Sequence, residues 1–473
     1  MSVLNSNVRH QYYFEELTKI PHGSGNEKAI SDYIVSIVKK LNLKYYQDEV
    51  NNVVIYKEAS KGYENHPAVM LQAHMDMVCE KDPSSNHDFE KDPLPIYIED
   101  GFLKSKGMTL GADDGAGVAY MLAILEDGAL KHPALECLFT VSEETTMLGA
   151  NSLDVSKLKA RRLINLDGEE EGYTMTSSCG GIDVVFNKEV EVITEKAKGY
   201  ELVVSGLSGG HSGGEIHKEK GNAMKIAARL LYKATKAGEL SVSEIYGGSK
   251  INAIPRDAYA RFVYSGNFEA VVLQEIKDIK KELEETDSGL DIKVNEYEVD
   301  NVMNTKDSKT LVSLLYILPN GLLHKSELQN NLTTSSCNLG ILRVKDGQIH
   351  FEMSIRGALR SYYEDTADVC IELANAYRYE AHRNNGYPCW DYIHNSELRD
   401  VMNKVHNEVY GKDIVMIGVH GGLECGVFKT KLPDLDIVTM GPNAADVHSP
   451  TERMELLSFD STYNFLVKFI EAL

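Results

Sequence analysis

The sequence predicts an α/β protein in which one α/β domain is interrupted by an inserted α+β domain. Over residues 1–181 and 386–473, apolar runs of strand length alternate with apolar residues at helical spacing. Several of these runs end directly before a His, Asp or Glu. Residues 182–385 carry alternating strands, long amphipathic helices and a faint internal repeat instead. A chain of 473 residues also exceeds one ordinary core, so we expect these two ranges to be separate domains.

Residues 10–42 are expected to form two helices joined by a loop. The first carries Tyr13, Leu17 and Ile20 as one apolar series. Pro21–Asn26 is rich in Gly and Ser and reads as the loop. The second helix is expected to begin near Asn26 or Glu27, and its apolar positions recur at helical spacing: Ile30, Tyr33, Ile34, Ile37, Val38 and Leu41.

The rest of the first domain reads as buried strands that end in polar groups. Strands are predicted at 52–56, 68–71, 135–141, 162–166 and 436–440. A helix after Gly117 places Val118, Met121, Leu122 and Leu125 on one face. The groups just past the strands are His74, Asp76, Glu143, Glu144, Asp167 and, after a longer turn, His448. Because ligands bind at the carboxyl ends of strands in open α/β sheets, we expect these side chains to meet at one edge.

The insertion shows two similar stretches. Leu230–Tyr232 is followed by Asn252, and Leu314–Tyr316 by Asn338. After each Asn comes a predicted strand (258–264 and 349–355) and then a helix (268–285 and 363–378). A further strand at 200–204 and a helix at 221–237 precede the first Asn. The pattern predicts two copies of an α/β sandwich unit, with chance similarity as the alternative.

Composition excludes several classes of partner. The net charge of −22 and the pI near 5.2 disfavour binding to nucleic acid or to an anionic membrane, because both repel an acidic surface. No apolar run approaches the ~20 residues needed to cross a bilayer, and the N-terminus lacks the layout of a signal peptide. The seven cysteines are scattered and unpaired in the sequence, which is typical of reduced thiols in the cytoplasm.

The stretch Gly111-Ala-Asp-Asp-Gly-Ala-Gly117 suggests a cation site. Two adjacent carboxylates in a Gly-rich turn are costly without a cation, although an acidic turn that caps a helix explains the stretch alone equally well. Two imidazoles and several carboxylates at equivalent strand ends, without cysteine, suit Zn²⁺ or a similar first-row divalent ion. Three protein ligands per ion would leave a position open for water or substrate, as in catalytic sites.

Five motifs in this order resemble the dinuclear zinc peptidases of the aminoacylase/carboxypeptidase G superfamily. They are Gln72-Ala-His-Met-Asp76, Gly111-Ala-Asp-Asp-Gly115, Ser142-Glu-Glu-Thr145, Leu166-Asp-Gly-Glu169 and Asp446-Val-His-Ser-Pro450. Gly206-Leu-Ser-Gly-Gly-His211 and His420-Gly-Gly-Leu-Glu-Cys-Gly426 are similar to the aminoacyl-histidine (Xaa-His) dipeptidases within it. The resemblance covers essentially the whole chain. It implies a mixed-sheet catalytic domain flanked by helices, with residues 182–385 as an inserted lid or dimerisation domain of two repeated units.

The resemblance also implies a role for each motif residue. His74 and Asp167 would hold one zinc ion, Glu144 and His448 the other, and Asp113 would bridge them, with Mn²⁺ or Co²⁺ as alternative metals. The peptide between Asp113 and Asp114 would be cis, and Asp114 would not be a ligand. Glu143 would be the general base that activates a metal-bridging water. Asp76 would orient the imidazole of His74.

The lid would supply the substrate contacts. By the resemblance, His211 stabilises the oxyanion, acting within its own subunit or across a homodimer formed through the lid. Asn252 and Arg356 would grip the substrate, and Gly422 would line the pocket with backbone. A guanidinium suits the free C-terminal carboxylate, and Arg360, four residues on, is the alternative for that task.

The expected activity is hydrolysis of unblocked dipeptides, with Xaa-His, including β-Ala-His, as the preferred class. The alternatives are a broader dipeptidase or tripeptidase, an N-acyl amino acid deacylase, and a non-catalytic protein that binds metal or peptide. Two features are interpreted structurally. Ser449–Glu452 fits a helix N-cap with a capping-box Glu, and His87, His132, His217 and His420 are expected at the surface or behind the site.

Overall fold

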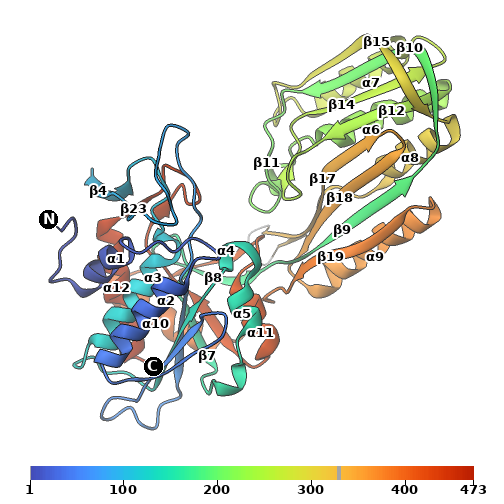
Figure 1. The fold of residues 1–473 in the computed structure, drawn as a ribbon. Helices are drawn as coiled ribbons and strands as arrows, with labels where there is room; N and C mark the ends of the chain where they lie inside the picture. The colour runs from blue at the N-terminus through green and yellow to red at the C-terminus, as the bar shows by residue number, and fades with distance from the viewer. Residues whose placement is uncertain (1, 328–331) are drawn as a thin grey trace. The chain divides into compact units, whose positions relative to one another are not determined.

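The computed structural model describes residues 2–327 and 332–473 and divides into two compact units (Figure 1). Unit 1 comprises Met1–Ser177, Tyr392–Gly418 and Glu424–Leu473. Unit 2 comprises Ser178–Asp391 and Val419–Leu423. Across the described residues, no helix is both long and apolar enough to cross a membrane.

Unit 1 begins with the two helices expected from the sequence, α1 (Arg9–Leu17) and α2 (Lys28–Lys40). Its main sheet has the order β1 (Lys44–Gln47), β2 (Val53–Lys57), β6 (Leu135–Thr140), β3 (Val69–His74), β7 (Arg162–Asn165), β21 (Asp436–Thr439). The pairs β6–β3, β3–β7 and β7–β21 are parallel, whereas β1–β2 and β2–β6 are antiparallel. Every residue of β3 and β6 is buried, as expected for strands covered on both faces.

The helix α3 (Ala112–Glu126) differs from the amphipathic helix that we expected. Its residues from Asp114 to Leu125 are all buried, so the prediction of a single apolar face is wrong. The helix packs between β3 and the helices α1 and α12 (Leu456–Glu471), and it therefore has no face toward solvent. The same core includes residues of α2 and of α10 (Glu397–Tyr410).

A small sheet joins distant parts of unit 1. Its order is β22 (Ala444–Ala445), β23 (Arg453–Glu455), β5 (Phe102–Ser105), β4 (Ile96–Glu99). The expectation of a helix N-cap at Ser449 is wrong, because the turn there leads into β23 and the helix begins only at Leu456. Pairing of Met454 with Leu103 holds this stretch extended, a constraint from a strand far away in the sequence.

The remaining elements of unit 1 are short. They are α4 (Glu143–Thr146), α5 (Leu148–Ser152), the 3₁₀ turn Val155–Lys157 and α11 (Glu424–Lys431), which packs against α5. The strand β8 (Tyr173–Ser178) pairs with β20 (Val415–Val419). All seven cysteines of the chain are free thiols, as expected.

Unit 2 is built on one long antiparallel sheet. Its order is β15 (Asp291–Met303), β10 (Val192–Ser205), β14 (Ala258–Tyr264), β12 (Leu240–Gly247), β17 (Leu332–Lys345), β18 (Gln348–Gly357), β9 (Gly180–Glu189), β19 (Glu380–Tyr387). The strand β16 (Gly321–Ser326) also pairs with β17, and β11 (Gly210–His211) pairs with β13 (Ala253–Ile254). Residues of α6 (Ala223–Ala237), α7 (Phe268–Glu282), α8 (Thr305–Ile317) and α9 (Arg360–Ala376) share one core with this sheet (Figure 1).

The two similar stretches of sequence contact each other in unit 2. The rings of Tyr232 on α6 and Tyr316 on α8 stack with centroids 4.0 Å apart and an interplanar angle of 6°. The side-chain amide of Asn338 donates to the carbonyls of Ile251 and Ala253, which flank Asn252. Equivalent positions of the two stretches therefore lie side by side, with β12 paired to β17 between them.

Candidate metal centre

The centre is built at the carboxyl ends of the parallel strands of unit 1. His74 is the last residue of β3 and is 1% exposed. Because β6 and β7 run parallel to β3 on its two sides, the segments after them bring Glu143, Glu144 and Asp167 to the same edge. His74 Nδ1 lies 3.0 Å from the backbone carbonyl of Asp76, which leaves Nε2 to face the other groups.

Asp113 faces two imidazoles with its two carboxylate oxygens. Oδ1 lies 2.9 Å from His74 Nε2, and Oδ2 lies 3.1 Å from His448 Nε2. The residue stands where α3 departs from helical geometry, after Gly111 at φ +69°, a left-handed conformation that favours glycine. The peptide between Asp113 and Asp114 is cis, as predicted.

Two further carboxylates complete two groups around Asp113. Asp167 Oδ1 lies 3.6 Å from His74 Nε2, and Glu144 Oε1 lies 2.8 Å from His448 Nε2. One carboxylate oxygen of Asp113 thus accompanies each imidazole-and-carboxylate pair. Imidazole and carboxylate donors in such groups are the ligands that zinc and related divalent ions take, so the residues present fit a metal centre.

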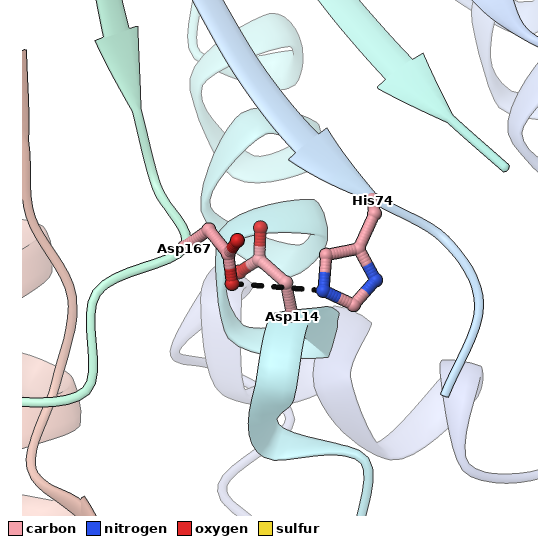
Figure 2. Close-up of side chains that lie close together, drawn as sticks. All are labelled: His74, Asp114 and Asp167. Carbon is pink, nitrogen blue, oxygen red and sulfur yellow. Dashed lines mark ion pairs between the residues drawn. The ribbon is translucent and has the colours of Figure 1, made fainter. Parts of the chain in front are cut away.

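Asp114 lies nearer to this centre than the sequence suggested. Ligand atoms of His74, Asp114 and Asp167 lie within 4.8 Å of one another (Figure 2), and those of His74, Asp113 and Glu144 form a second such group. Asp114 Oδ1 accepts a hydrogen bond from the Gly117 amide, whereas its buried Oδ2 has no partner in the part of the chain that the structure describes. A buried oxygen of this kind is expected to have a partner, so a cation bound between these three residues would find a further acceptor in Asp114.

Several side chains of the centre have strongly shifted pKa values. Hydrogen bonds to Asp113 and Glu144 raise the pKa of His448 to about 11. Burial, and then the neighbouring Asp113, hold the pKa of Asp167 well above its usual range. Burial does the same for Glu143, with Asp167 adding to the effect. The raised pKa values show that ionised carboxylates repel one another here. A bound divalent cation would offset this repulsion.

Asp76 connects the imidazole of His74 to the segment that carries Glu143. Its Oδ1 lies 3.4 Å from His74 Nδ1 and accepts the Glu143 amide at 3.0 Å, and its Oδ2 accepts the Glu144 amide and the Ser24 hydroxyl. The closer acceptor for the imidazole is the backbone carbonyl of Asp76. The carboxylate therefore does more than orient the ring, because it also holds the backbone of the acidic pair.

Three carboxylates near the centre were not predicted. Glu424 is 1% exposed, and its Oε2 accepts hydrogen bonds from Gln72 Nε2 and Thr140 Oγ1. Glu452 accepts the amides of Leu110, Gly111 and Ala112. Burial raises the pKa of Glu169 to about 7, and the charge of Asp113 adds to this. The hydrogen bonds of Glu424 and Glu452 join positions far apart in the chain, so local sequence patterns do not predict them.

The predicted substrate contacts lie in unit 2. Strand β11 pairs His211 with Ala253, next to Asn252, and His211 Nδ1 accepts the amides of Gly213 and Gly214. The segment that carries His211 is therefore held by a short ladder. On β18, Arg356 is 8% exposed, donates to the Tyr387 hydroxyl at 2.7 Å and has a buried Nε without a partner among the described residues.

Gly422 is half-buried in the segment that follows His420. His420 was expected at the surface or behind the site and is 8% exposed. Its Nδ1 lies 2.9 Å from Cys179 Sγ and its Nε2 lies 2.6 Å from Ser336 Oγ. Burial, and then the nearby charge of Arg356, lower the pKa of His420 to about 3. It is therefore a neutral link among buried groups of unit 2.

Known proteins match this chain along most of its length. A model of the peptidase family M20/M25/M40 matches residues 70–472. The cytosol non-specific dipeptidase of Escherichia coli K12 is 34% identical over 470 residues, which are 97% of this chain and 96% of that protein. The crystal structure of aminoacylhistidine dipeptidase from Vibrio alginolyticus matches with a TM-score of 0.91 and 30% identity, over 100% of this chain and 98% of that one.

A more distant structure shows the fold alone. The aminopeptidase PepT of Bacillus cereus matches with a TM-score of 0.58 and 16% identity, over 99% of each chain. Together with the nearer relatives, it confirms the mixed α/β fold class expected from the sequence.

Proposed function

The chain belongs to the peptidase family M20/M25/M40, and from that premise we propose that it is a metal-dependent dipeptidase for unblocked dipeptides. The observation that supports this most directly is Asp113, whose two oxygens face the imidazoles of His74 and His448 at 2.9 and 3.1 Å. This is the arrangement that a carboxylate shared by two metal ions requires. Family membership also confirms the resemblance first seen in the motifs.

We assign the ligands in two sets. His74 and Asp167 would hold one divalent ion, His448 and Glu144 the other, and Asp113 would be common to both. Zn²⁺ is the expected metal, with Mn²⁺ and Co²⁺ as alternatives. When bound, such ions polarise a carbonyl group and lower the pKa of a water molecule to about 7.

Glu143 is the proposed general base. Its backbone amide is held by Asp76, and its neighbour Glu144 is one of the proposed ligands. Burial and the neighbouring Asp167 raise the pKa of Glu143, and a carboxylate with a raised pKa accepts a proton from water more readily. The protonated Glu143 can then deliver that proton to the amine that leaves when the peptide bond breaks.

Four residues of unit 2 are proposed to bind the peptide. Arg356 suits the free carboxylate at the C-terminus of a dipeptide, because its buried Nε has no partner among the described residues. His211 would stabilise the oxyanion. Asn252, held beside His211 by strands β11 and β13, would contact the substrate, and the Gly422 backbone would line the pocket.

Two substrate ranges are supported by different relatives. The Vibrio alginolyticus enzyme is named for aminoacyl-histidine peptides, which favours Xaa-His dipeptides, including β-Ala-His, as the preferred class. The Escherichia coli enzyme is named as non-specific, which favours a broad dipeptidase. Tripeptides and N-acyl amino acids are the remaining alternatives within the family.

A hydrolysis panel with defined metals tests the proposal. Chelator-treated protein should lose activity toward dipeptides, and Zn²⁺, Mn²⁺ or Co²⁺ should restore it. Glu143→Gln should retain both metal ions yet lose most turnover, since the amide cannot accept a proton. Full activity of the metal-free protein, or hydrolysis confined to N-acyl amino acids, would contradict the assignment.

We further propose that the enzyme works in the cytoplasm on small peptides and forms a homodimer through residues 182–385. The location follows from the name of the Escherichia coli relative, a cytosol dipeptidase, and from the free thiols. Sedimentation of the purified full chain gives the oligomeric state directly, and a monomer at micromolar concentration would exclude the dimer.

A further inference from the structure

Glu452 makes contacts that no role assigned so far explains. The side chain is 3% exposed, and its two carboxylate oxygens accept three backbone amides. Oε2 accepts those of Leu110 and Gly111 at 2.7 and 3.1 Å, and Oε1 accepts that of Ala112 at 2.8 Å. These amides belong to the turn that ends at Asp113, some 340 residues away in the sequence.

The amides need an acceptor from elsewhere in the chain. The amides of Leu110 and Gly111 precede α3, and that of Ala112 is the first amide of the helix, which has no partner within it. At the start of α3 the capping position is Gly111, which makes no side-chain cap. Glu452 supplies the missing acceptor from the segment that follows His448. The turn before Asp113 is therefore held from outside α3.

Glu452 also belongs to the turn that carries His448. Its own amide donates to the Ser449 carbonyl at 3.1 Å, which closes the turn directly after His448. Two contacts thus join the same two segments: Glu452 to Ala112, and His448 Nε2 to Asp113 Oδ2. Because the contact of Glu452 with Ala112 holds the two segments together, it also limits the distance between Asp113 and His448.

We propose that Glu452 is a positioning residue that sets the distance between Asp113 and His448, and with it the affinity for the metal ion on the His448 side. The inference rests on the proposed ligand sets. His74 ends β3 and Asp167 follows β7, whereas the Glu452 carboxylate bonds to the amides of 110–112. The ion on that side should therefore depend less on Glu452. Residues that orient metal ligands typically contribute 10–100-fold to metal affinity or activity.

The test is a Co²⁺ titration of the full chain, followed by visible absorption and by calorimetry, on wild-type protein and Glu452→Gln. The Gln side chain keeps one acceptor oxygen, but an NH₂ group replaces the other. That group cannot accept a hydrogen bond from a backbone amide. We expect one of the two Co²⁺ ions, the ion on the His448 side, to lose affinity about tenfold or more and its absorption band to change, while the other ion shifts less. For dipeptide hydrolysis at a fixed Co²⁺ concentration that saturates both sites of the wild type, kcat should fall more than KM rises.

Glu15→Gln is the matched control. Glu15 is 8% exposed on α1, and its carboxylate also accepts backbone amides, those of Val3 and Leu4, at 3.0 and 2.7 Å. This variant should lose stability while both Co²⁺ affinities stay at wild-type values. Glu452→Asp, which keeps the charge on a shorter side chain, should restore less than half of the lost affinity.

The outcomes separate this inference from the proposed function. A wild-type protein that binds fewer than two Co²⁺ ions refutes the ligand sets, and this inference with them. If wild type binds two and Glu452→Gln binds both with unchanged affinity, only the inference fails. Equal weakening of both ions also overturns it, since that is the signature of a general structural defect.

Discussion

Glu424 provides a direct test of how burial affects a carboxylate beneath the candidate centre. It is the first residue of α11 and is 1% exposed. Oε2 accepts Gln72 Nε2 and Thr140 Oγ1, both at 2.7 Å, while Oε1 has no partner among the described residues. Burial raises the pKa of Glu424 to about 7. Glutamine is close in shape to the protonated acid, so Glu424→Gln removes the ionisation and little else.

The magnitude follows from the difference in pKa. A rise from the usual 4.5 to about 7 is about 2.5 units, and at about 1.36 kcal/mol per unit this is about 3 kcal/mol. Because the folded-state pKa is the higher one, the folded protein binds the proton more tightly. Glu424 therefore favours folding fully below pH 4.5, and this contribution is lost as the pH rises through 7. At pH 8 the Gln variant should be more stable than wild type by up to about 3 kcal/mol.

The assay is urea unfolding of the chelator-treated protein between pH 4.5 and 8.5. The free energies of unfolding of wild type and Glu424→Gln should agree near pH 4.5 and diverge as the pH rises. Glu136→Gln is the control, because the Glu136 carboxylate accepts the amides of Lys159 and Ala160 and is 5% exposed. That variant should be less stable than wild type. A constant difference between wild type and Glu424→Gln across the pH range would refute the reasoning.

Two further predictions concern activity. Glu27→Ala removes the acceptor of the Ser142 amide and hydroxyl, at 3.0 and 2.8 Å. Since Ser142 directly precedes the proposed base, kcat should fall about 10–100-fold with KM little changed, as steady-state kinetics on a dipeptide would show; an unchanged kcat would count against this role. Arg356→Lys should raise KM for dipeptides about tenfold or more, because a hydrogen bond to a charged group contributes about 1.5–3 kcal/mol. Arg360→Lys, at a side chain that is 79% exposed, should leave KM unchanged, and the reverse pattern would assign the carboxylate contact to Arg360.

Local sequence patterns predicted the main strands of unit 1 and the polar residues at their ends. Apolar runs predicted β3, β6, β7 and β21, and the positions after them predicted which groups would meet. These signals work because a buried strand leaves a continuous apolar run and its end is marked by a change to polar residues. The roles of those groups as metal ligands remain proposals.

The errors share one cause. The turn at Ser449 has the residues of a helix N-cap, yet it leads into β23, which pairs with β5. The helix α3 has an apolar stripe, yet it is covered on all sides. In both places a partner distant in the sequence overrode the local preference, which amounts to only about 1 kcal/mol for a cap.

The sequence by itself determined the fold class, the family and the residue types available for a metal centre. These properties depend on hydrophobic periodicity and on the order of the motifs, and both can be read directly from the sequence. Only the tertiary structure decided that the oxygens of Asp113 face two different imidazoles and that Glu452 holds the turn before it. The same holds for Glu424, which lies beneath the centre with one oxygen unpaired among the described residues. Hydrogen bonds and burial act over a few ångströms, and folding alone brings positions more than 300 residues apart to that distance.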